Sequence, residues 1–377
     1  MKKVLAMKAE NSFYGDKLRL ARLLNGLTQQ QLGDYISASR QFVHQLEGGI
    51  RQPADDVLNE LCETLCVKRS FFCEPVGNDV KFEQCHFRKR KTTPVSIANR
   101  VLAFSTIFEE LVAYINERLE LPPANFPAIK HSVSEYSNSE IELAAEECRK
   151  IWGLGLTTPI AKMTRVLENA GVVITQFSGV SDKVDALSLN RKFPIIVRND
   201  AKESVCRMRF DLAHECGHFV LHDGVETGDH ITESEANKFA SAFLFPRAAF
   251  LNEFKSSKSS QLDWALIYKL KIRWGMSAKA ILFRAHYLDL ISSQQYRTGN
   301  VHLSKTCQTK IEKHDDVILP ETPELLTQAF NILKNQLGIS FNHISDYLGI
   351  EPDMLSLITG IYPENEEYLE NVISIFG

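Results

Sequence analysis

Residues 209–218 read RFDLAHECGH and end on an H-E-x-x-H motif. The apolar spacing around the motif predicts a helix over about 206–221. His214 and His218, four positions apart, then project from one helical face and lie close enough to share one ion. Glu215 lies beside the coordination position left open, where it can accept a proton from water. The motif therefore predicts a Zn²⁺ site with His214 and His218 as ligands and Glu215 as catalytic base.

A catalytic zinc needs a third protein ligand, and the next predicted helix offers one. This helix is expected to begin at a Thr232 cap and to place Glu233 and Asn237 on one face. Glu233 is the predicted metal ligand, and Asn237 is expected to orient a ligand histidine. Glu235 points to another side and is the weaker candidate. His222 is either a rival ligand or a histidine favoured by the helix dipole at the C-terminal end.

The N-terminal segment 13–75 is dense in signals for short helices. Thr28 is a good N-cap for a helix that ends near Ile36, and a second helix is expected from Arg40 to about Glu47. A tight turn between two short helices is helix-turn-helix geometry.

Polar residues lie on the outward side of the second of these helices. Arg40, Gln41 and His44 are expected to reach base edges in the major groove of double-stranded DNA. Gln29 and Ser39, near the helix starts, would contact phosphates or base edges. The alternative for Gln41 and His44 is ordinary solvated polarity. Base-specific binding would normally require two copies, so a homodimer is expected.

The remaining chain contains connecting and mixed segments. A basic run within 86–94 reads as a linker that could also hold a phosphate backbone, and an apolar helix is expected over 95–119. Residues 138–291 alternate predicted helices with short strands near 172–175, 188–189 and 195–197. The tail, 300–377, is predicted to be helical. Within it, 339–358 resembles a degenerate helix-turn-helix without basic residues, which favours packing or dimerisation.

Composition sets the class of protein. The chain has 377 residues, a formal net charge of −4, 44% hydrophobic and 24% charged residues, as in a soluble multidomain protein. No apolar run is long enough to cross a bilayer, so a cytoplasmic protein without membrane contact is expected. The cysteines are scattered without a C-x-x-C pair, which favours buried thiols over a disulfide framework, although a zinc role remains open for those in the N-terminal segment.

Two family resemblances follow from these motifs. The region from about 140 to 291 resembles the ImmA/IrrE family of bacterial metallopeptidase domains. The matching features are IWG at 151–153, PI at 159–160, GVV at 171–173, RFDLAHECGH at 209–218, ESEANKFA at 233–240, FLFP at 243–246, WGMS at 274–277 and LIS at 290–292. The resemblance implies a gluzincin-like core with a small sheet packed on the metal-site helix, and zinc held by two histidines and one glutamate.

Residues 13–72 resemble the Xre/Cro helix-turn-helix family. The matches are LTQQQLG at 27–33, SRQFVHQLEGG at 39–49 and RQP at 51–53. The two resemblances occur in the order found in regulators that fuse an Xre module to an ImmA/IrrE domain. The tail has no recognisable family.

Together these observations predict a mainly α fold with a small β-sheet (α+β). The expected domains are a helix-turn-helix DNA-binding domain at 13–75, a basic linker and connecting helix at 76–134, a zinc metallopeptidase domain at 135–297 and a helical C-terminal region at 298–377. The expected function is a DNA-binding transcriptional regulator whose peptidase domain cleaves a repressor, a partner or itself in a stress, phage or mobile-element response. The alternatives are a regulator whose peptidase-like domain only senses a ligand or binds a partner, and a toxin–antitoxin or phage-defence component.

Overall fold

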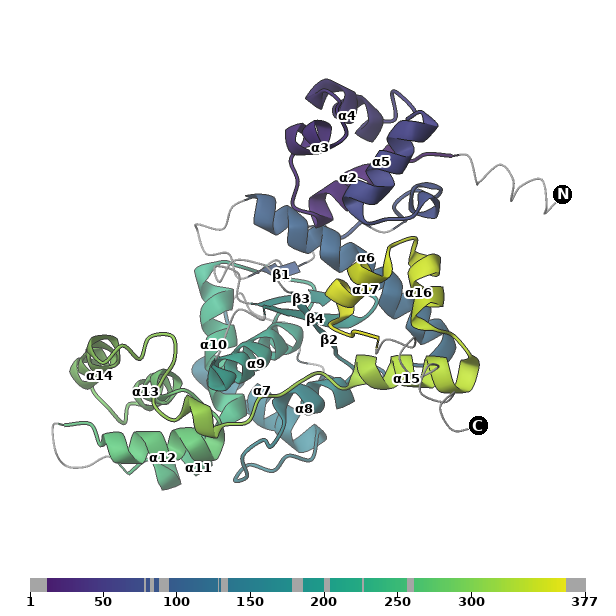
Figure 1. The fold of residues 1–377 in the computed structure, drawn as a ribbon. Helices are drawn as coiled ribbons and strands as arrows, with labels where there is room; N and C mark the ends of the chain where they lie inside the picture. Colours follow the sequence, from purple (N-terminus) through teal and green to yellow (C-terminus); the bar gives the residue numbers. More distant parts are fainter. Residues whose placement is uncertain are drawn as a thin grey trace, which may run out of the picture. The chain divides into compact units, whose positions relative to one another are not determined.

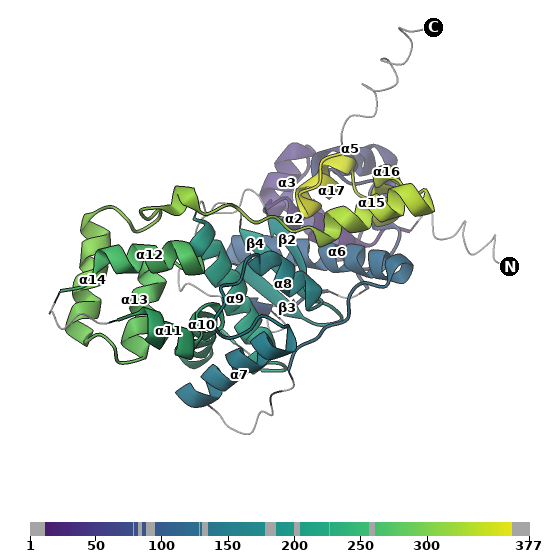
Figure 2. The ribbon, with the colours of Figure 1, turned by 90° about the horizontal axis from the view of Figure 1, so that it is seen from below.

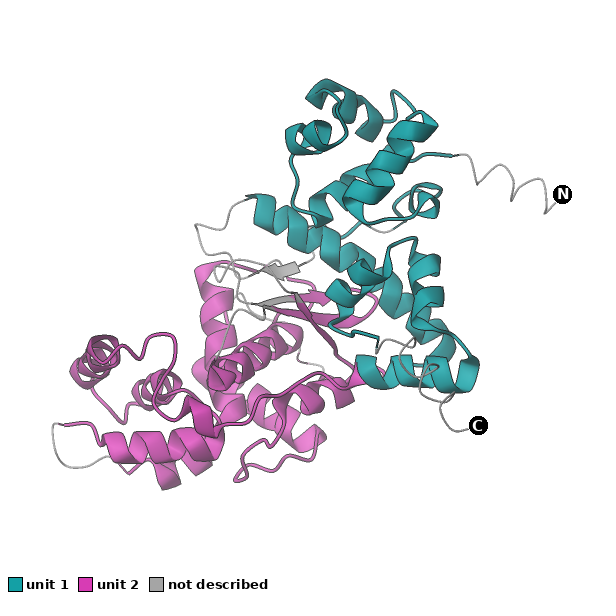
Figure 3. Cartoon of the chain, in the orientation of Figure 1, with its two compact units in different colours: residues 1–81, 93–120, 326–377 teal, residues 82–92, 121–325 magenta. Residues whose placement is uncertain are grey.

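The computed structural model describes residues 12–77, 79–81, 85–87, 95–127, 129, 135–177, 186–199, 204–225, 227–255 and 261–363. The chain divides into two compact units (Figure 3). Unit 1 comprises 1–81, 93–120 and 326–377, and unit 2 comprises 82–92 and 121–325. Both units are mainly helical and one small sheet lies in unit 2, which confirms the predicted fold class. The four functional domains predicted above remain predictions.

Unit 1 begins with short helices that surround one apolar core (Figure 1). These are α2 (Gly15–Leu24), α3 (Gln29–Tyr35), α4 (Arg40–Glu47), α5 (Asp55–Leu65) and the 3₁₀ helix η1 (Arg69–Phe72). Thr28 accepts a hydrogen bond from the Gln31 amide at the start of α3, and Ser39 accepts one from the Phe42 amide at the start of α4. The short connection between α3 and α4 is compatible with the predicted helix-turn-helix.

The same unit contains α6 (Val95–Leu119), with the bounds that the sequence predicts, and three helices from the tail. The tail helices are α15 (Leu325–Leu337), α16 (Phe341–Leu348) and α17 (Pro352–Thr359). Both α16 and α17 contact α6. The helices of the tail therefore belong to the same compact unit as the N-terminal helices, although more than 200 residues separate them in sequence.

Unit 2 contains a mixed four-stranded sheet in the order β1-β3-β4-β2. The strands are β1 (Cys85–Phe87), β2 (Val173–Phe177), β3 (Ala186–Asn190) and β4 (Pro194–Asn199). β3 pairs antiparallel with β1 and β4, with Leu189 opposite Ile195, whereas β2 runs parallel to β4. The sequence predicts β2, β3 and β4, but β1 falls within the predicted linker. The basic residues 88–91 of that linker lie outside the described residues.

Helices pack around this sheet and around one another (Figure 2). They are α7 (Asn138–Ile151), α8 (Met163–Asn169), α9 (Val205–Leu221), α10 (His230–Leu244), α11 (Arg247–Glu253), α12 (Trp264–Trp274), α13 (Ala278–Tyr287), α14 (Ser293–Lys305) and the short 3₁₀ helix η3 (Asp315–Val317). α9 packs on β3 and β4, and α10 packs on α9. A large apolar core between these elements includes Leu212, Phe239 and Phe243.

Two further predictions concern the cysteines and the possibility of a membrane-spanning helix. The cysteines with described side chains are free thiols, as predicted, but only Cys148, Cys206 and Cys216 are buried. The prediction of buried thiols is wrong for the N-terminal segment, where Cys62 and Cys73 are half-buried and Cys66 is exposed. Among the described residues, no helix combines the length and the apolar character that a membrane crossing requires.

Candidate metal centre

Helix α9 carries the H-E-x-x-H motif and is almost entirely buried. Its N-terminal half is fixed by Arg209, whose guanidinium donates hydrogen bonds to the carbonyls of Ile160 (2.6 Å) and Gly275 (3.2 Å) and pairs with Glu321. An arginine fork held by carbonyls from separate loops leaves α9 little freedom to rotate. The helix therefore presents the two motif histidines in a fixed direction.

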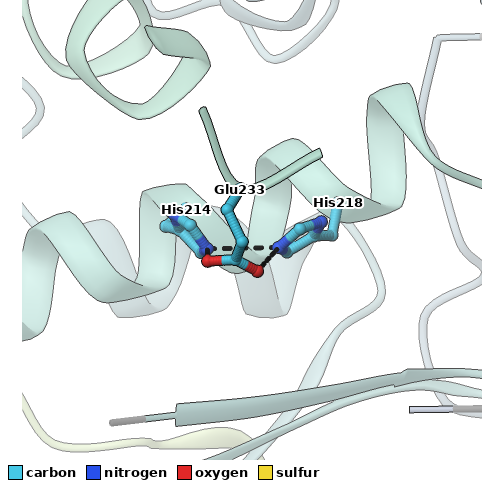
Figure 4. Close-up of side chains that lie close together, drawn as sticks. All are labelled: His214, His218 and Glu233. Atoms are coloured by element: carbon cyan, nitrogen blue, oxygen red, sulfur yellow. Dashed lines mark hydrogen bonds and ion pairs between the residues drawn. The ribbon is translucent and has the colours of Figure 1, made fainter. Parts of the chain in front are cut away.

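His214, His218 and Glu233 converge on one point between α9 and α10 (Figure 4). The two Nε2 atoms are 3.1 Å apart, and each lies 3.5 Å from a carboxylate oxygen of Glu233. Both rings are buried, whereas the Glu233 side chain stays 19% exposed. The three residues predicted as a metal-ligand set are thus brought together.

The motif glycine allows α10 to approach α9 this closely. A Cβ atom on Gly217 would lie 3.0 Å from Cδ1 of Phe239 and 3.3 Å from Cα of Ala236. Any larger side chain would push α10 outward and carry Glu233 away from the histidines. This role is not among the predictions from sequence.

A hydrogen bond with Asn237 determines which ring nitrogen of His214 carries the proton. Its Nδ1 lies 3.1 Å from Oδ1 of Asn237, which can only accept. The neutral ring therefore carries its proton on Nδ1, and the lone pair of Nε2 points toward His218 and Glu233. Asn237 occupies the orienting position that the sequence predicts.

A second chain of hydrogen bonds orients His218. Its Nδ1 lies 3.0 Å from Nδ1 of His222, whose Nε2 lies 2.8 Å from Oε2 of Glu235. Oε1 of Glu235 accepts the Tyr136 amide at 2.6 Å. The carboxylate of Glu235 accepts a hydrogen bond from the Nε2–H group of His222. The Nδ1 atom of a neutral His222 must then accept a hydrogen bond, which His218 donates from its own Nδ1. His218 thus also presents a lone pair on Nε2.

His222 and Glu235 therefore contact the site indirectly, which sequence reasoning did not foresee. His222 is neither a third ligand nor merely a histidine near a helix end. The predicted cap at Thr232 is also wrong, because α10 begins earlier and Asp229 accepts the amides of Ile231 and Thr232. Because α10 begins at His230, Glu233 is its fourth residue and not its first.

The donor set fits a small divalent cation. Two imidazole lone pairs and a carboxylate all lie within 4.8 Å of one another, and in this tautomeric arrangement no proton lies between them. Two histidines and one glutamate are a ligand set found in catalytic zinc sites.

Glu215 lies beside this cluster without joining it. Its carboxylate accepts a hydrogen bond from the hydroxyl of Ser188 on β3. Burial raises the pKa of Glu215 to about 7, against the lowering effects of His214 and of the Ser188 hydrogen bond. A carboxylate that titrates near neutral pH can exchange a proton with water in either direction. Ser188 is a second residue that sequence reasoning missed, because its strand contacts α9 only in the folded chain.

The predicted DNA-contact residues lie on α3 and α4 in unit 1. Arg40, Gln41 and His44 are exposed on α4. Gln29 donates a hydrogen bond to Glu47 at 2.7 Å, and the hydroxyl of Ser39 caps α4. All five lie near the N-terminal ends of the two helices or on the outer side of α4, and Nδ1 of His44 lies 3.5 Å from Nε2 of Gln29.

One comparison with known families bears on unit 2. Residues 167–286 match the model of the peptidase M78 family, which is described as the IrrE N-terminal-like domain. The match covers the span from α8 to α13 and includes every residue of the convergent cluster. No curated protein matches the chain.

Proposed function

We propose that unit 2 is a zinc-dependent metallopeptidase domain and that the chain is a DNA-binding transcriptional regulator that cleaves a protein. The main support for a peptidase is that His214, His218 and Glu233 converge on one point. Beside them lies the buried Glu215, which accepts a hydrogen bond from Ser188. The match of residues 167–286 to a peptidase family supports the same reaction class. A domain that only senses a ligand would not need a buried carboxylate, held by a hydroxyl group, beside the cluster.

In this proposal the three convergent side chains hold Zn²⁺, and each protein group has a defined task. When bound, the zinc supplies Lewis-acid activation of water and of the scissile carbonyl. Glu215 accepts a proton from the attacking water and later donates it to the leaving amine. Ser188 holds the carboxylate of Glu215 in place. Asn237 and the His222–Glu235 pair keep the two ligand rings in the tautomer that binds a metal.

The hydrogen bonds from His218 through His222 to Glu235 are expected to contribute to the zinc affinity. Glu235→Gln is expected to weaken zinc binding by about 10–100-fold, because the amide no longer fixes the tautomer of His222 and hence of His218. Competition of the full chain with a chelating dye measures the affinity. Glu140→Gln, which alters an exposed helix cap on α7, is the matched control. An unchanged affinity in Glu235→Gln would contradict the proposed orienting role.

The N-terminal helices provide the proposed DNA-binding surface. Arg40, Gln41 and His44 point outward from α4 while Val43 and Leu46 anchor the helix in the core. Arg40 and Gln41 thus offer a guanidinium and an amide to a major groove, while His44 lies beside Gln29. Two chains would read two half-sites of an operator. We propose double-stranded DNA and a protein substrate as the partners, with a homodimer as the DNA-binding form.

Substitutions on α4 test this surface. With duplexes selected from a random pool by the wild-type protein, Arg40→Ala and Gln41→Ala are each expected to cost about 1–3 kcal/mol of binding free energy. Gln30→Ala is the control, because Gln30 lies on α3 and is paired with Asp34 on its own helix. Failure to select any duplex, or equal binding by all variants, would contradict DNA reading by α4. Mass measurement of the complex gives the number of chains per duplex.

A further inference from the structure

The tail helices repeat the first three helices of the chain at a constant offset. α3 begins at 29 and α16 at 341, while α4 spans 40–47 and α17 spans 352–359, an offset of 312 residues in each case. The helices that precede them, α2 and α15, end at corresponding places, and each is followed by a glycine with left-handed backbone, Gly26 (φ +70°) and Gly338 (φ +67°).

The repeat extends to the caps. Thr28 and Ser340 occupy equivalent positions, and each accepts a hydrogen bond from the amide three residues later. α4 and α17 both end at a glycine, Gly48 and Gly360. These are the signals that set where each helix starts and stops, so the two segments are built to the same local plan.

The buried positions also correspond. Leu32, Val43 and Leu46 of the first segment are fully buried, and so are their equivalents Ile344, Leu355 and Ile358. In the preceding helices, Ala21 corresponds to the buried Leu333. Matching helix starts for α3 and α4, matching caps and matching core positions define α15–α17 as a second helix-turn-helix module, although few residues are identical between the two segments.

The DNA-contact positions are not retained in the second module. Ser39, Arg40 and Gln41 are replaced by Glu351, Pro352 and Asp353 at the equivalent positions. Two carboxylates in place of a hydroxyl and an amide would repel the phosphate backbone.

The remaining two positions have also changed. Phe341 stands where Gln29 stands in the first module, and Ser356, the equivalent of the exposed His44, is buried. α17 contacts α6, so this helix packs within unit 1 instead of presenting an outer face.

The turn of the second module is docked on the segment that follows α5. The Lys68 amide donates to the Gly349 carbonyl at 2.7 Å, and the Glu351 amide donates to the Cys66 carbonyl at 3.0 Å. A Cβ atom on Gly349 would lie 2.7 Å from the backbone of Phe71. These two backbone hydrogen bonds and the close approach make a specific contact, because no substituent fits between the segments.

Side chains extend the docked contact on both sides of the turn. Lys68 pairs with Asp346, and the ring of Tyr347 lies 4.2 Å from that of Tyr114 on α6, between centroids. The guanidinium of Arg118 covers the Tyr114 ring at 3.5 Å. All of these residues belong to unit 1.

We propose that α15–α17 are a helix-turn-helix module converted from DNA reading to protein docking, and that its partner is the N-terminal module of the same chain. The inference goes beyond the proposed function. The comparison with DNA reading rests on the proposed contacts of α4, whereas the docking does not, because its contacts exist whether or not α4 reads DNA. The face formed by residues 66–71 is then occupied within every chain, so two chains pair through another surface. The role of the tail is to complete the N-terminal module.

Two glycines provide a matched test. Gly349→Ala and Gly338→Ala impose the same strain, since both positions have φ +67°, but only the first places a methyl group against the Phe71 backbone. In the full chain, Gly349→Ala is expected to raise amide hydrogen exchange about tenfold or more over 62–72 and 341–359. Gly338→Ala is expected to leave exchange over 62–72 at the wild-type rate.

The outcome decides the proposal. Equal exchange over 62–72 in the two variants would overturn it, because docking would then contribute nothing to the N-terminal module. If Gly349→Ala unfolds unit 1 as a whole, Tyr347→Ala replaces it, since this side chain is 58% exposed and its loss creates no clash. Faster exchange over 62–72 in Tyr347→Ala supports the proposal, and wild-type exchange there overturns it.

Discussion

Replacing Glu215 by glutamine is expected to reduce peptide hydrolysis by about 10²–10⁴-fold while the protein retains its metal. Glutamine preserves the size of the side chain and can still hydrogen-bond with Ser188, but it cannot accept a proton from water. The three convergent side chains are untouched by the change. Hydrolysis of fluorescently labelled casein by the full chain, beside metal content by mass spectrometry, measures both quantities.

Glu147→Gln is the control for this experiment, because Glu147 lies on α7 and its side chain is 51% exposed. Activity in this variant should equal that of the wild type. A Glu215→Gln protein that cleaves as fast as the wild type would remove Glu215 from the mechanism. A wild-type protein that retains metal but cleaves neither casein nor itself would favour the sensing alternative.

Glu233→Ala is expected to weaken zinc binding by more than about 100-fold, which exceeds the effect of losing a group that only supports a ligand. The two histidines alone leave the ion with too few protein ligands for a stable tetrahedral site. The remaining imidazoles stay oriented by Asn237 and His222, so the fold around them should persist. Dye competition gives the affinity, and circular dichroism checks the fold.

The expected order of effects separates ligands from supporting residues. Glu233→Ala should lose more affinity than Glu235→Gln, although Glu235 is the more deeply buried of the two carboxylates. The reverse order would mean that Glu235 binds the metal and that Glu233 does not.

The ligand set could be predicted from the sequence because its residues follow a local spacing. Two histidines one helical turn apart and a glutamate on the next amphipathic helix are visible in the spacing alone. The bounds of α6, α9, α16 and α17 follow from apolar periodicity and caps in the same way. Where a residue acts through neighbours on its own helix, the sequence is sufficient to predict its place.

The residues that escaped prediction act across the fold. Ser188 lies on a strand whose contact with α9 depends on the sheet register, which is set by pairing between distant segments. The helical spacing makes Glu235 the weaker candidate ligand, and Glu235 is not part of the metal cluster. It nevertheless acts on the site through a hydrogen bond with His222, which the spacing does not reveal. β1 is three residues long, too short for a periodic pattern to reveal.

The degenerate helix-turn-helix in the tail illustrates the same limit. Its helix bounds and the Ser340 cap follow from the sequence. Its position in unit 1 does not, because docking on 66–71 joins distant segments, with Lys68 and Asp346 separated by 278 positions in the chain. The lack of basic residues in this segment favours a packing or dimerisation role, and α16 and α17 do pack against α6 within unit 1.

The most direct measurement is anomalous diffraction at the zinc absorption edge from crystals of the full chain grown with zinc. The account predicts one strong peak within ligand distance of Nε2 of His214, Nε2 of His218 and the carboxylate of Glu233. It also predicts that Glu215 lies near this peak without binding it. A well-ordered site without a peak, or a peak held by other residues, would contradict the central claim.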